Sequence, residues 1–285
     1  MQSEIKYVRA NGLRFGYFEQ GIGPLIILLH GFPDTPHTWN FVQPQLAQAG
    51  YRVVAPFMRG YPPSDISANK DYGVLALGQD IVALIEALGE KQAIVIGHDW
   101  GAFAAYAAAN LSPQSIRKLV VVAIPHPGAL RFNLQTLIKT HHFLTFQFRS
   151  WAVKRLRRDN MSEINAIYRR WSPNWQVSEL ELAPVKETLR MPKALEGALG
   201  YYLSFRREAI GRKGAATRQL IRQQTSTPTL AFFGVEDGAL DQSSISRTRS
   251  CYSGPYEVVR VPKVGHFLHR EIPEEFVRRV LAFIQ

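Results

Sequence analysis

Short runs of aliphatic residues that end in glycine or histidine constrain the fold of this 285-residue chain more than any other feature. Leu25–Leu29 is a continuous aliphatic run followed by His30 and Gly31, as expected of a strand that is buried on both faces. The segments between such runs have helical spacing, for example at residues 79–88, which end before Gly89. This alternation of strand and helix predicts a mostly parallel sheet with helices on both faces.

The pattern of apolar residues predicts eight strands, at residues 5–8, 13–19, 25–29, 51–56, 93–96, 119–124, 229–233 and 257–261. The first two are typical of a hairpin bridged by Asn11 and Gly12. The strand pattern stops after Ile124, and the following segment has helical patterns at residues 143–157, 162–171 and 192–208. We therefore expect an α/β core formed by residues 1–127 and 225–285, interrupted by a helical insertion at residues 128–224.

The net charge of +11 comes entirely from that insertion. Residues 128–224 hold 18 Lys and Arg against 7 Asp and Glu, whereas the rest of the chain holds 16 of each sign. The excess indicates either a solvated basic surface or a field that attracts anionic or amphipathic substrates or weakly associates with a membrane surface. Nucleic-acid binding is not expected, because no recognition motif accompanies the charge.

Other features of the sequence narrow the class of protein. A single cysteine, Cys251, excludes a disulfide scaffold and a cysteine-rich zinc site. The first residues lack the apolar stretch of a signal peptide, and the longest apolar runs are far shorter than the roughly 20 residues that span a bilayer. We expect a cytoplasmic protein without stable membrane insertion.

The most informative motif is Gly97-His98-Asp99-Trp100-Gly101, which lies between an aliphatic strand and an alanine-rich helix. A nucleophile flanked by small residues at a strand-to-helix turn forms a nucleophile elbow, in which a strained backbone raises the central side chain above the sheet. The alternative is an ordinary turn in which Asp99 serves as a helix N-cap.

Three further segments follow predicted strands. They are His30–Pro33 after the third strand, Gly234–Asp237 after a late strand and Gly265–Phe267 after the last strand. Together with the elbow, these segments give the order nucleophile, acid, histidine along the chain, which is the order found in one particular fold. The loop after the third strand would supply an oxyanion donor. The chain resembles the α/β-hydrolase superfamily over essentially its whole length. Glu236 and Asp241 compete with Asp237 for the role of the acid, and His269 with His266 for that of the histidine.

Because the elbow holds aspartate rather than serine, the chain is most similar to the epoxide hydrolase and haloalkane dehalogenase branch. A carboxylate suits displacement at a saturated carbon, which gives an alkyl-enzyme ester. The resemblance implies that Asp99 is the nucleophile and that His266, oriented by Asp237, activates the water that hydrolyses the ester. It also implies that the main-chain N–H groups of Phe32 and Trp100 hold the oxyanion, and that neither cofactor nor metal is needed.

Epoxide hydrolases supply two hydrogen-bond donors from the helical insertion, or cap, to the opening oxygen, and both are usually tyrosines. By resemblance, Gly197–Tyr202 matches the later motif, which makes Tyr202 one donor. The other donor precedes a glutamine by five residues, which from Gln147 falls on His142, with His141 as a competitor. The expected substrate contacts are Trp100, Phe32, Phe143, Phe146, Tyr201 and Phe267.

Two other functions stay open. In haloalkane dehalogenation, Trp100 would offer its indole N–H to the halide. Phe32 replaces one usual second donor, an asparagine, but a cap tryptophan stays open as the other, at Trp151, Trp171 or Trp175. Fluoroacetate dehalogenases place arginines just after the aspartate, and none follows Asp99. A small-molecule binding protein or receptor on the same fold is an alternative of another class. The favoured prediction is an epoxide hydrolase that acts on a small substrate as a monomer or homodimer.

Overall fold

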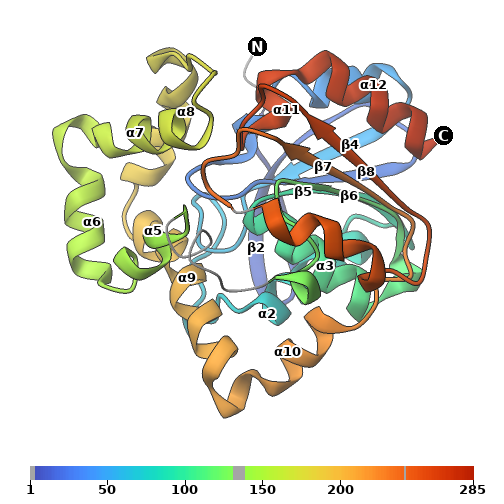
Figure 1. Cartoon of the computed structure of the whole chain (residues 1–285), viewed down its shortest axis with the longest axis horizontal. Coiled ribbons are helices and arrows are strands. Elements are labelled where there is room, and N and C mark those ends of the chain that lie inside the picture. Colours follow the sequence, from blue (N-terminus) through green and yellow to red (C-terminus); the bar gives the residue numbers. More distant parts are fainter. Residues whose placement is uncertain (1–3, 131–138, 241) are drawn as a thin grey trace.

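The computed structural model describes residues 4–130, 139–240 and 242–285, and Figure 1 shows its arrangement. The core is an eight-stranded sheet with the order β1-β2-β4-β3-β5-β6-β7-β8. Its strands are β1 (Lys6–Ala10), β2 (Leu13–Gln20), β3 (Leu25–Leu29), β4 (Arg52–Pro56), β5 (Ala93–His98), β6 (Ile116–Val122), β7 (Thr229–Gly234) and β8 (Tyr256–Val261). The eight-stranded, mostly parallel sheet predicted from the sequence is confirmed.

Only the first strands depart from parallel pairing. β1 and β2 form an antiparallel hairpin that turns at Asn11 and Gly12, as predicted, and β2 pairs antiparallel with β4. All later pairs are parallel, so the strands from β3 to β8 place their carboxyl ends at one edge of the sheet. Side chains that follow these strands therefore meet at that edge, as ligand-binding residues do in open α/β sheets.

Helices cover both faces of the sheet (Figure 1). On one face, α2 (Val74–Ala87) packs against α3 (Trp100–Leu111), which lies on β3, β5 and β6. On the other face, α1 (Gln43–Gln48) contacts β4 and α12 (Pro273–Ile284), and the short α11 (Leu268–Glu271) contacts β7. Nearly every side chain of the central strands is buried, as expected of a sheet that is covered on both sides.

Between β6 and β7 the chain forms a helical insertion. Its helices are α5 (His141–Thr145), α6 (Arg149–Arg157), α7 (Ser162–Trp171), α8 (Glu179–Arg190), α9 (Ala194–Ile210) and α10 (Ala215–Arg222). In Figure 1, α5 to α8 lie beside the sheet, and α10 lies below it, where it contacts α3 and α9. The boundaries 128–224 for this unit stay a prediction.

The structure corrects the helix predictions at several points. The predicted helix 143–157 is two helices, because Phe148 adopts a non-helical backbone (φ −87°, ψ 65°) between α5 and α6. Between β3 and β4, a 3-10 turn at Pro36–Trp39 precedes α1. The sequence analysis missed α8 and α10 altogether. Within the described residues, no helix combines the length and apolar character needed to cross a membrane.

Candidate active site

Asp99 lies at the sharp turn from β5 into α3. Its backbone adopts φ 49° and ψ −117°, a conformation that residues other than glycine rarely adopt. The turn needs a glycine at position 31, since a Cβ there would lie 2.4 Å from both Cβ and Oδ1 of Asp99. The carboxylate makes no hydrogen bond to the first turn of α3, so the interpretation of Asp99 as a helix-capping side chain is wrong.

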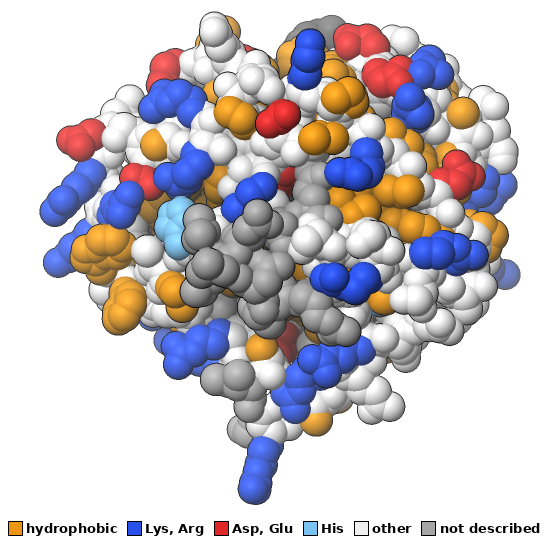
Figure 2. Space-filling view, in the orientation of Figure 1, with side chains coloured by type: hydrophobic (Ala, Val, Ile, Leu, Met, Phe, Trp, Pro, Cys, Tyr) orange, Lys and Arg blue, Asp and Glu red, His pale blue; other side chains and the backbone are white. Residues whose placement is uncertain are grey.

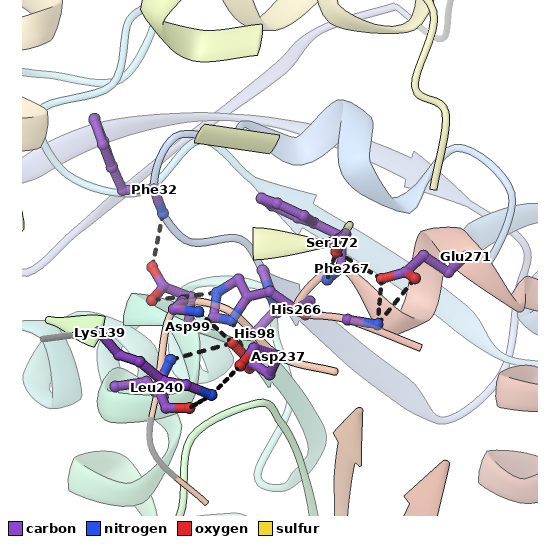
Figure 3. Close-up of polar contacts among 12 residues, drawn as sticks. Phe32, His98, Asp99, Lys139, Ser172, Asp237, Leu240, His266, Phe267 and Glu271 are labelled. Atoms are coloured by element: carbon purple, nitrogen blue, oxygen red, sulfur yellow. Dashed lines mark hydrogen bonds and ion pairs between the residues drawn. The ribbon is translucent and has the colours of Figure 1, made fainter. Parts of the chain in front are cut away.

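The loop after β3 binds one oxygen of this carboxylate. The main-chain N–H of Phe32 donates to Oδ1 of Asp99 at 2.8 Å, as Figure 3 shows. Trp100 is the first residue of α3, so its N–H lies outside the hydrogen-bond ladder of the helix. The main-chain N–H of Phe32 therefore lies next to the carboxylate of Asp99. The role of Trp100 as the second donor stays a prediction.

His266 and Asp237 extend this arrangement on the other side of Asp99 (Figure 3). Nδ1 of His266 is hydrogen-bonded to Oδ2 of Asp237 at 2.8 Å, while Nε2 of the same ring lies 3.7 Å from Oδ2 of Asp99. The other oxygen of Asp237 accepts the N–H groups of Ala239 and Leu240, which fixes the orientation of the carboxylate. The imidazole therefore directs Nδ1 at Asp237 and Nε2 at Asp99.

The electrostatics of Asp99 and His266 favour an ionised carboxylate at Asp99. Burial alone would raise the pKa of Asp99, but the hydrogen bond and charge of His266 outweigh it and leave that pKa below its usual value. Burial alone would lower the pKa of His266, but the charges and hydrogen bonds of Asp237 and Asp99 raise it to about 10. Asp99 is therefore a carboxylate beside an imidazolium in the free protein.

A comparison with known proteins agrees with this geometry. The model of the alpha/beta hydrolase fold family matches residues 24–271. The chain belongs to the α/β-hydrolase superfamily. It is 30% identical to the AB hydrolase superfamily protein YfhM of Bacillus subtilis, over 98% of this chain and 97% of that protein.

Further relatives of this α/β-hydrolase place it in the epoxide hydrolase branch. Epoxide hydrolase A of Mycobacterium tuberculosis is 27% identical, over 98% of this chain and 96% of that protein. The solved structure of a laboratory-evolved variant of potato epoxide hydrolase is 25% identical and superposes with a TM-score of 0.86, over 99% of both chains.

Tyr202 and His142 of the α/β-hydrolase come together from α9 and α5. Their ring centroids lie 5.9 Å apart, and both side chains are buried. Burial raises the pKa of Tyr202 well above its usual value, and the charge of Asp99 adds to this, which keeps the phenol protonated. Burial lowers the pKa of His142 to about 3, although the charge of Asp99 acts against it. Both groups are therefore neutral, and each can donate one hydrogen bond.

Four aromatic side chains surround Tyr202. Its ring centroid lies between 4.8 and 5.6 Å from those of Trp100, Phe32, Phe143 and Phe146, in edge-to-face contacts. The two other expected substrate contacts have different surroundings. The hydroxyl of Tyr201 donates to the main-chain oxygen of Arg59 at 2.7 Å, and Phe267 stacks on Tyr168 at a centroid distance of 4.0 Å. Contact of substrate with Tyr201 and Phe267 stays a prediction.

The competing candidates lie elsewhere. His141 is exposed whereas His142 is buried, which favours His142 as the second donor. His269 contacts the hydroxyl of Thr38 at 2.6 Å, and Glu236 is exposed on the loop before Asp237. Asp241 lies outside the described residues. Within the described ranges, no group of His, Cys, Asp and Glu side chains could hold a metal ion.

The sequence did not predict which residues of the insertion hold the loops of Asp237 and His266. The main-chain oxygen of Trp171, at the end of α7, accepts the N–H groups of Gly238 at 3.1 Å and His266 at 3.0 Å. The next residue, Ser172, accepts the N–H of Phe267 at 3.1 Å. We call Trp171 and Ser172 the α7 clamp.

Glu271 completes this contact from the core (Figure 3). Its carboxylate accepts the hydroxyl of Ser172 at 2.7 Å and the N–H of Gly265 at 2.9 Å. Gly265 packs so closely that a Cβ there would lie 2.4 Å from Cα of Ser172. The main chain on both sides of His266 is therefore bonded to the α7 clamp or to Glu271.

Proposed function

We propose that this hydrolase opens an epoxide to a vicinal diol through a covalent ester on Asp99. The observation that carries the proposal is the placement of the Asp99 carboxylate between the main-chain N–H of Phe32 and Nε2 of His266. Tyr202 and His142 add two neutral donors whose pKa values both respond to the charge of Asp99. The names of the relatives support the same reaction class.

In the first step, Oδ2 of Asp99 attacks a ring carbon of the epoxide. A carbon–oxygen bond forms to the carboxylate, and the carbon–oxygen bond of the epoxide breaks, so that its electron pair goes to the ring oxygen. Tyr202 and His142 donate hydrogen bonds to that oxygen. Tyr202 then transfers its proton to the oxygen, which becomes a hydroxyl, and Tyr202 is left as a phenolate. Oδ1, already bonded to Phe32, becomes the ester carbonyl.

In the second step, Nε2 of His266 takes a proton from water while the water oxygen attacks Cγ of Asp99. The negative charge that develops on Oδ1 is stabilised by the N–H groups of Phe32 and Trp100. The tetrahedral intermediate then collapses: the Cγ–O bond to the substrate breaks, and the departing oxygen takes the proton from His266 to become the second hydroxyl of the diol. The acid form of Asp99 returns its proton to His266, which restores the starting state.

Formation of the ester has removed the charge of Asp99, one of the causes that raise the pKa of His266. The imidazole is thus a stronger proton donor in the ester than in the free enzyme. It gives its proton to the Tyr202 phenolate left by ring opening and becomes the neutral base.

The remaining assignments complete the proposal. Residues 128–224 form the cap domain over a core of residues 1–127 and 225–285. The substrate is a small epoxide, anionic or amphipathic in keeping with the basic cap, and the enzyme acts in the cytoplasm as a monomer or homodimer. No cofactor takes part.

Trapping the ester tests this proposal. The variant His266→Gln, mixed with styrene oxide, should gain the mass of one substrate molecule, because alkylation proceeds and hydrolysis does not. The double variant Asp99→Asn, His266→Gln should gain no mass. Turnover of the wild-type enzyme in water enriched in ¹⁸O should label the peptide that contains Asp99. An unchanged mass of His266→Gln under conditions in which the wild-type enzyme forms diol would contradict the mechanism.

Dehalogenation is the second candidate, because the indole of Trp100 is buried directly after the nucleophile and could bind a halide. A panel of epoxides, haloalkanes and haloacids assayed side by side, with halide release monitored, distinguishes the two reactions. Diol formation without halide release supports the epoxide hydrolase. A binding protein of the same fold would form no adduct in His266→Gln, so the trapping experiment also tests that alternative.

A further inference from the structure

Three large apolar side chains lie exposed together on the outer surface of the cap. Leu144, Phe148 and Trp151 are 57%, 70% and 50% exposed, and with Thr145 they line one shallow groove on α5 and α6. Single exposed apolar residues are common on protein surfaces, but adjacent phenylalanine, tryptophan and leucine side chains mark a site of contact. We call these three residues the apolar ridge.

Basic side chains flank the apolar ridge, and acidic ones are absent from the same stretch of sequence. Residues 139–158 contain six Lys and Arg and no Asp or Glu. Lys154 follows Trp151 by three positions in α6 and is exposed on the same side, and the guanidinium of Arg155 lies 5.4 Å from the Trp151 ring centroid. Figure 2 shows hydrophobic side chains beside Lys and Arg side chains where α5 and α6 lie.

Some of this charge is not neutralised within the protein. Arg155 pairs with Glu163, and Arg157 lies 3.7 Å from Glu196. Among the described residues, no salt bridge forms to Lys154 or Arg158, and both are exposed. The unpaired charge therefore continues from Trp151 along α6, at Lys154 and at Arg158, the first residue after the helix.

We propose that the apolar ridge docks this enzyme on an anionic lipid surface. Aromatic and aliphatic side chains beside lysine and arginine match the interface of such a bilayer, where apolar groups enter the headgroup region and cations remain at the phosphates. A surface with acidic side chains would be repelled, and a purely basic surface would lack the inserted anchors. The apolar ridge with its cations fits lipid better than nucleic acid, because phosphate contacts alone require no exposed Leu or Phe.

The position of the apolar ridge links docking to substrate entry. α5 exposes Leu144 on one side and buries His142 and Phe146 on the other. A cavity of about 40 Å³ between α5, α6 and α7 is lined both by Trp151 of the apolar ridge and by His142 and Phe146. An amphipathic substrate dissolved in the bilayer would therefore meet the enzyme at the helix that carries a proposed donor. Docking itself does not depend on the proposed reaction.

Sedimentation with vesicles tests the docking surface on the full-length protein without any assay of turnover. We expect the protein to bind phosphatidylcholine vesicles that contain about one quarter phosphatidylglycerol at least about tenfold more tightly than pure phosphatidylcholine vesicles. Binding should weaken several-fold between about 50 and 300 mM NaCl. Equal binding to both kinds of vesicle, or none to either, would overturn the proposal.

Paired variants separate the apolar and basic contributions. Phe148→Ser with Trp151→Ser should reduce binding at least about fivefold even at low salt, and Lys154→Glu with Arg158→Glu should abolish the preference for anionic lipid. The matched controls are Ile22→Ser and Lys91→Glu, which change exposed residues far from the apolar ridge in the sequence; the side chain of Ile22 is 89% exposed. Both variants should bind vesicles as the wild type does. Controls that lose as much binding would overturn the assignment to this surface.

Two further outcomes would also contradict the proposal. If light scattering shows that Phe148→Ser with Trp151→Ser halves the mass of the particle, the apolar ridge is an interface between two copies of the chain. If single-stranded RNA binds more tightly than anionic vesicles and competes with them, the basic side chains serve nucleic acid. A folded monomer that loses vesicle binding on removal of the apolar ridge supports lipid docking.

Discussion

The main-chain oxygen of Trp171 accepts the main-chain N–H of His266 at 3.0 Å. The proposed general base is thus held by a residue of the helical insertion as well as by the core loop on which it lies. Because Trp171 also accepts the N–H of Gly238, the α7 clamp fixes the loops of Asp237 and His266 relative to one another. In the proposed mechanism, accurate placement of Nε2 against the ester depends on this contact.

Loosening the α7 clamp should slow hydrolysis of the ester more than its formation. Ser172→Ala removes the hydroxyl bonded to Phe267 N and Glu271, and Glu271→Gln replaces a carboxylate that accepts Gly265 N with an amide. We expect the hydrolysis rate to fall about tenfold, or about 1.4 kcal/mol, with little change in the alkylation rate. Rapid mixing followed by intact-mass measurement reports both rates.

The matched control for this pair is Glu275→Gln, which removes a charge on the exposed side of α12 where Glu275 pairs with Arg278 and Arg279. It should leave both rates unchanged. If Ser172→Ala and Glu271→Gln lower the melting temperature but do not cause the ester to accumulate during turnover, the residues are structural and do not position His266.

Tyr202→Phe should slow ring opening at least about tenfold, or about 1.4 kcal/mol, because the opening oxygen loses a donor. The measurement is the rate of alkylation in a His266→Gln background, which isolates the first step. Tyr106→Phe serves as the control, since it also removes a buried hydroxyl, one on α3 that is bonded to the hydroxyl of Tyr252 at 2.8 Å. Equal alkylation rates in the two variants would exclude Tyr202 as a donor.

The raised pKa of His266 predicts how stability depends on pH. The pKa is 6.5 in an unperturbed histidine and about 10 in the folded protein, so between these values the folded state keeps a proton that the unfolded state has lost. The contribution is therefore fully present below about pH 6.5 and is lost as the pH rises through about 10. Denaturant unfolding should show this fall, by at most about 1.4 kcal/mol per pH unit.

Comparison with His266→Gln isolates that single proton, because the lysines and tyrosines that titrate in the same range are common to both proteins. The wild-type curve should fall more steeply with pH than the curve of the variant. Parallel curves would show that His266 is not protonated in the free enzyme at neutral pH.

The basic cap should favour anionic epoxides at low ionic strength. Added salt should reduce kcat/KM for a carboxylated epoxide more than for a neutral one, because long-range attraction is screened over about 10 Å at 0.1 M salt. Assays at several salt concentrations, with a matched pair of substrates, measure the difference. An equal response of the two substrates would confine the role of the basic surface to solubility or to docking.

The sheet and the residues around Asp99 were predictable because each of them follows a strand. In a mostly parallel sheet, the ends of β3, β5, β7 and β8 meet at one edge, so short motifs after the strands converge whatever lies between them. That convergence brought Phe32, Asp99, Asp237 and His266 together from segments separated by up to 234 residues (266 − 32).

The contacts of the insertion were not predictable in the same way. The contact at Trp171 is made by a main-chain oxygen, which every residue has, so no side-chain motif in the sequence predicts it. The break between α5 and α6 at Phe148 likewise depends on tertiary packing and not on glycine or proline. Tyr201 and Tyr202 are neighbours on α9, and their different partners follow from the approximately 100° between successive residues of a helix.

The two hydrogen bonds at Trp171 also limit how far α7 can move from the core during the proposed reaction. In the proposed reaction diol has to leave and substrate has to enter, yet displacing α7 would break its main-chain hydrogen bond to His266. We therefore expect α7 to stay against the core throughout the proposed reaction. Substrate and product would then be exchanged while His266 keeps its main-chain support.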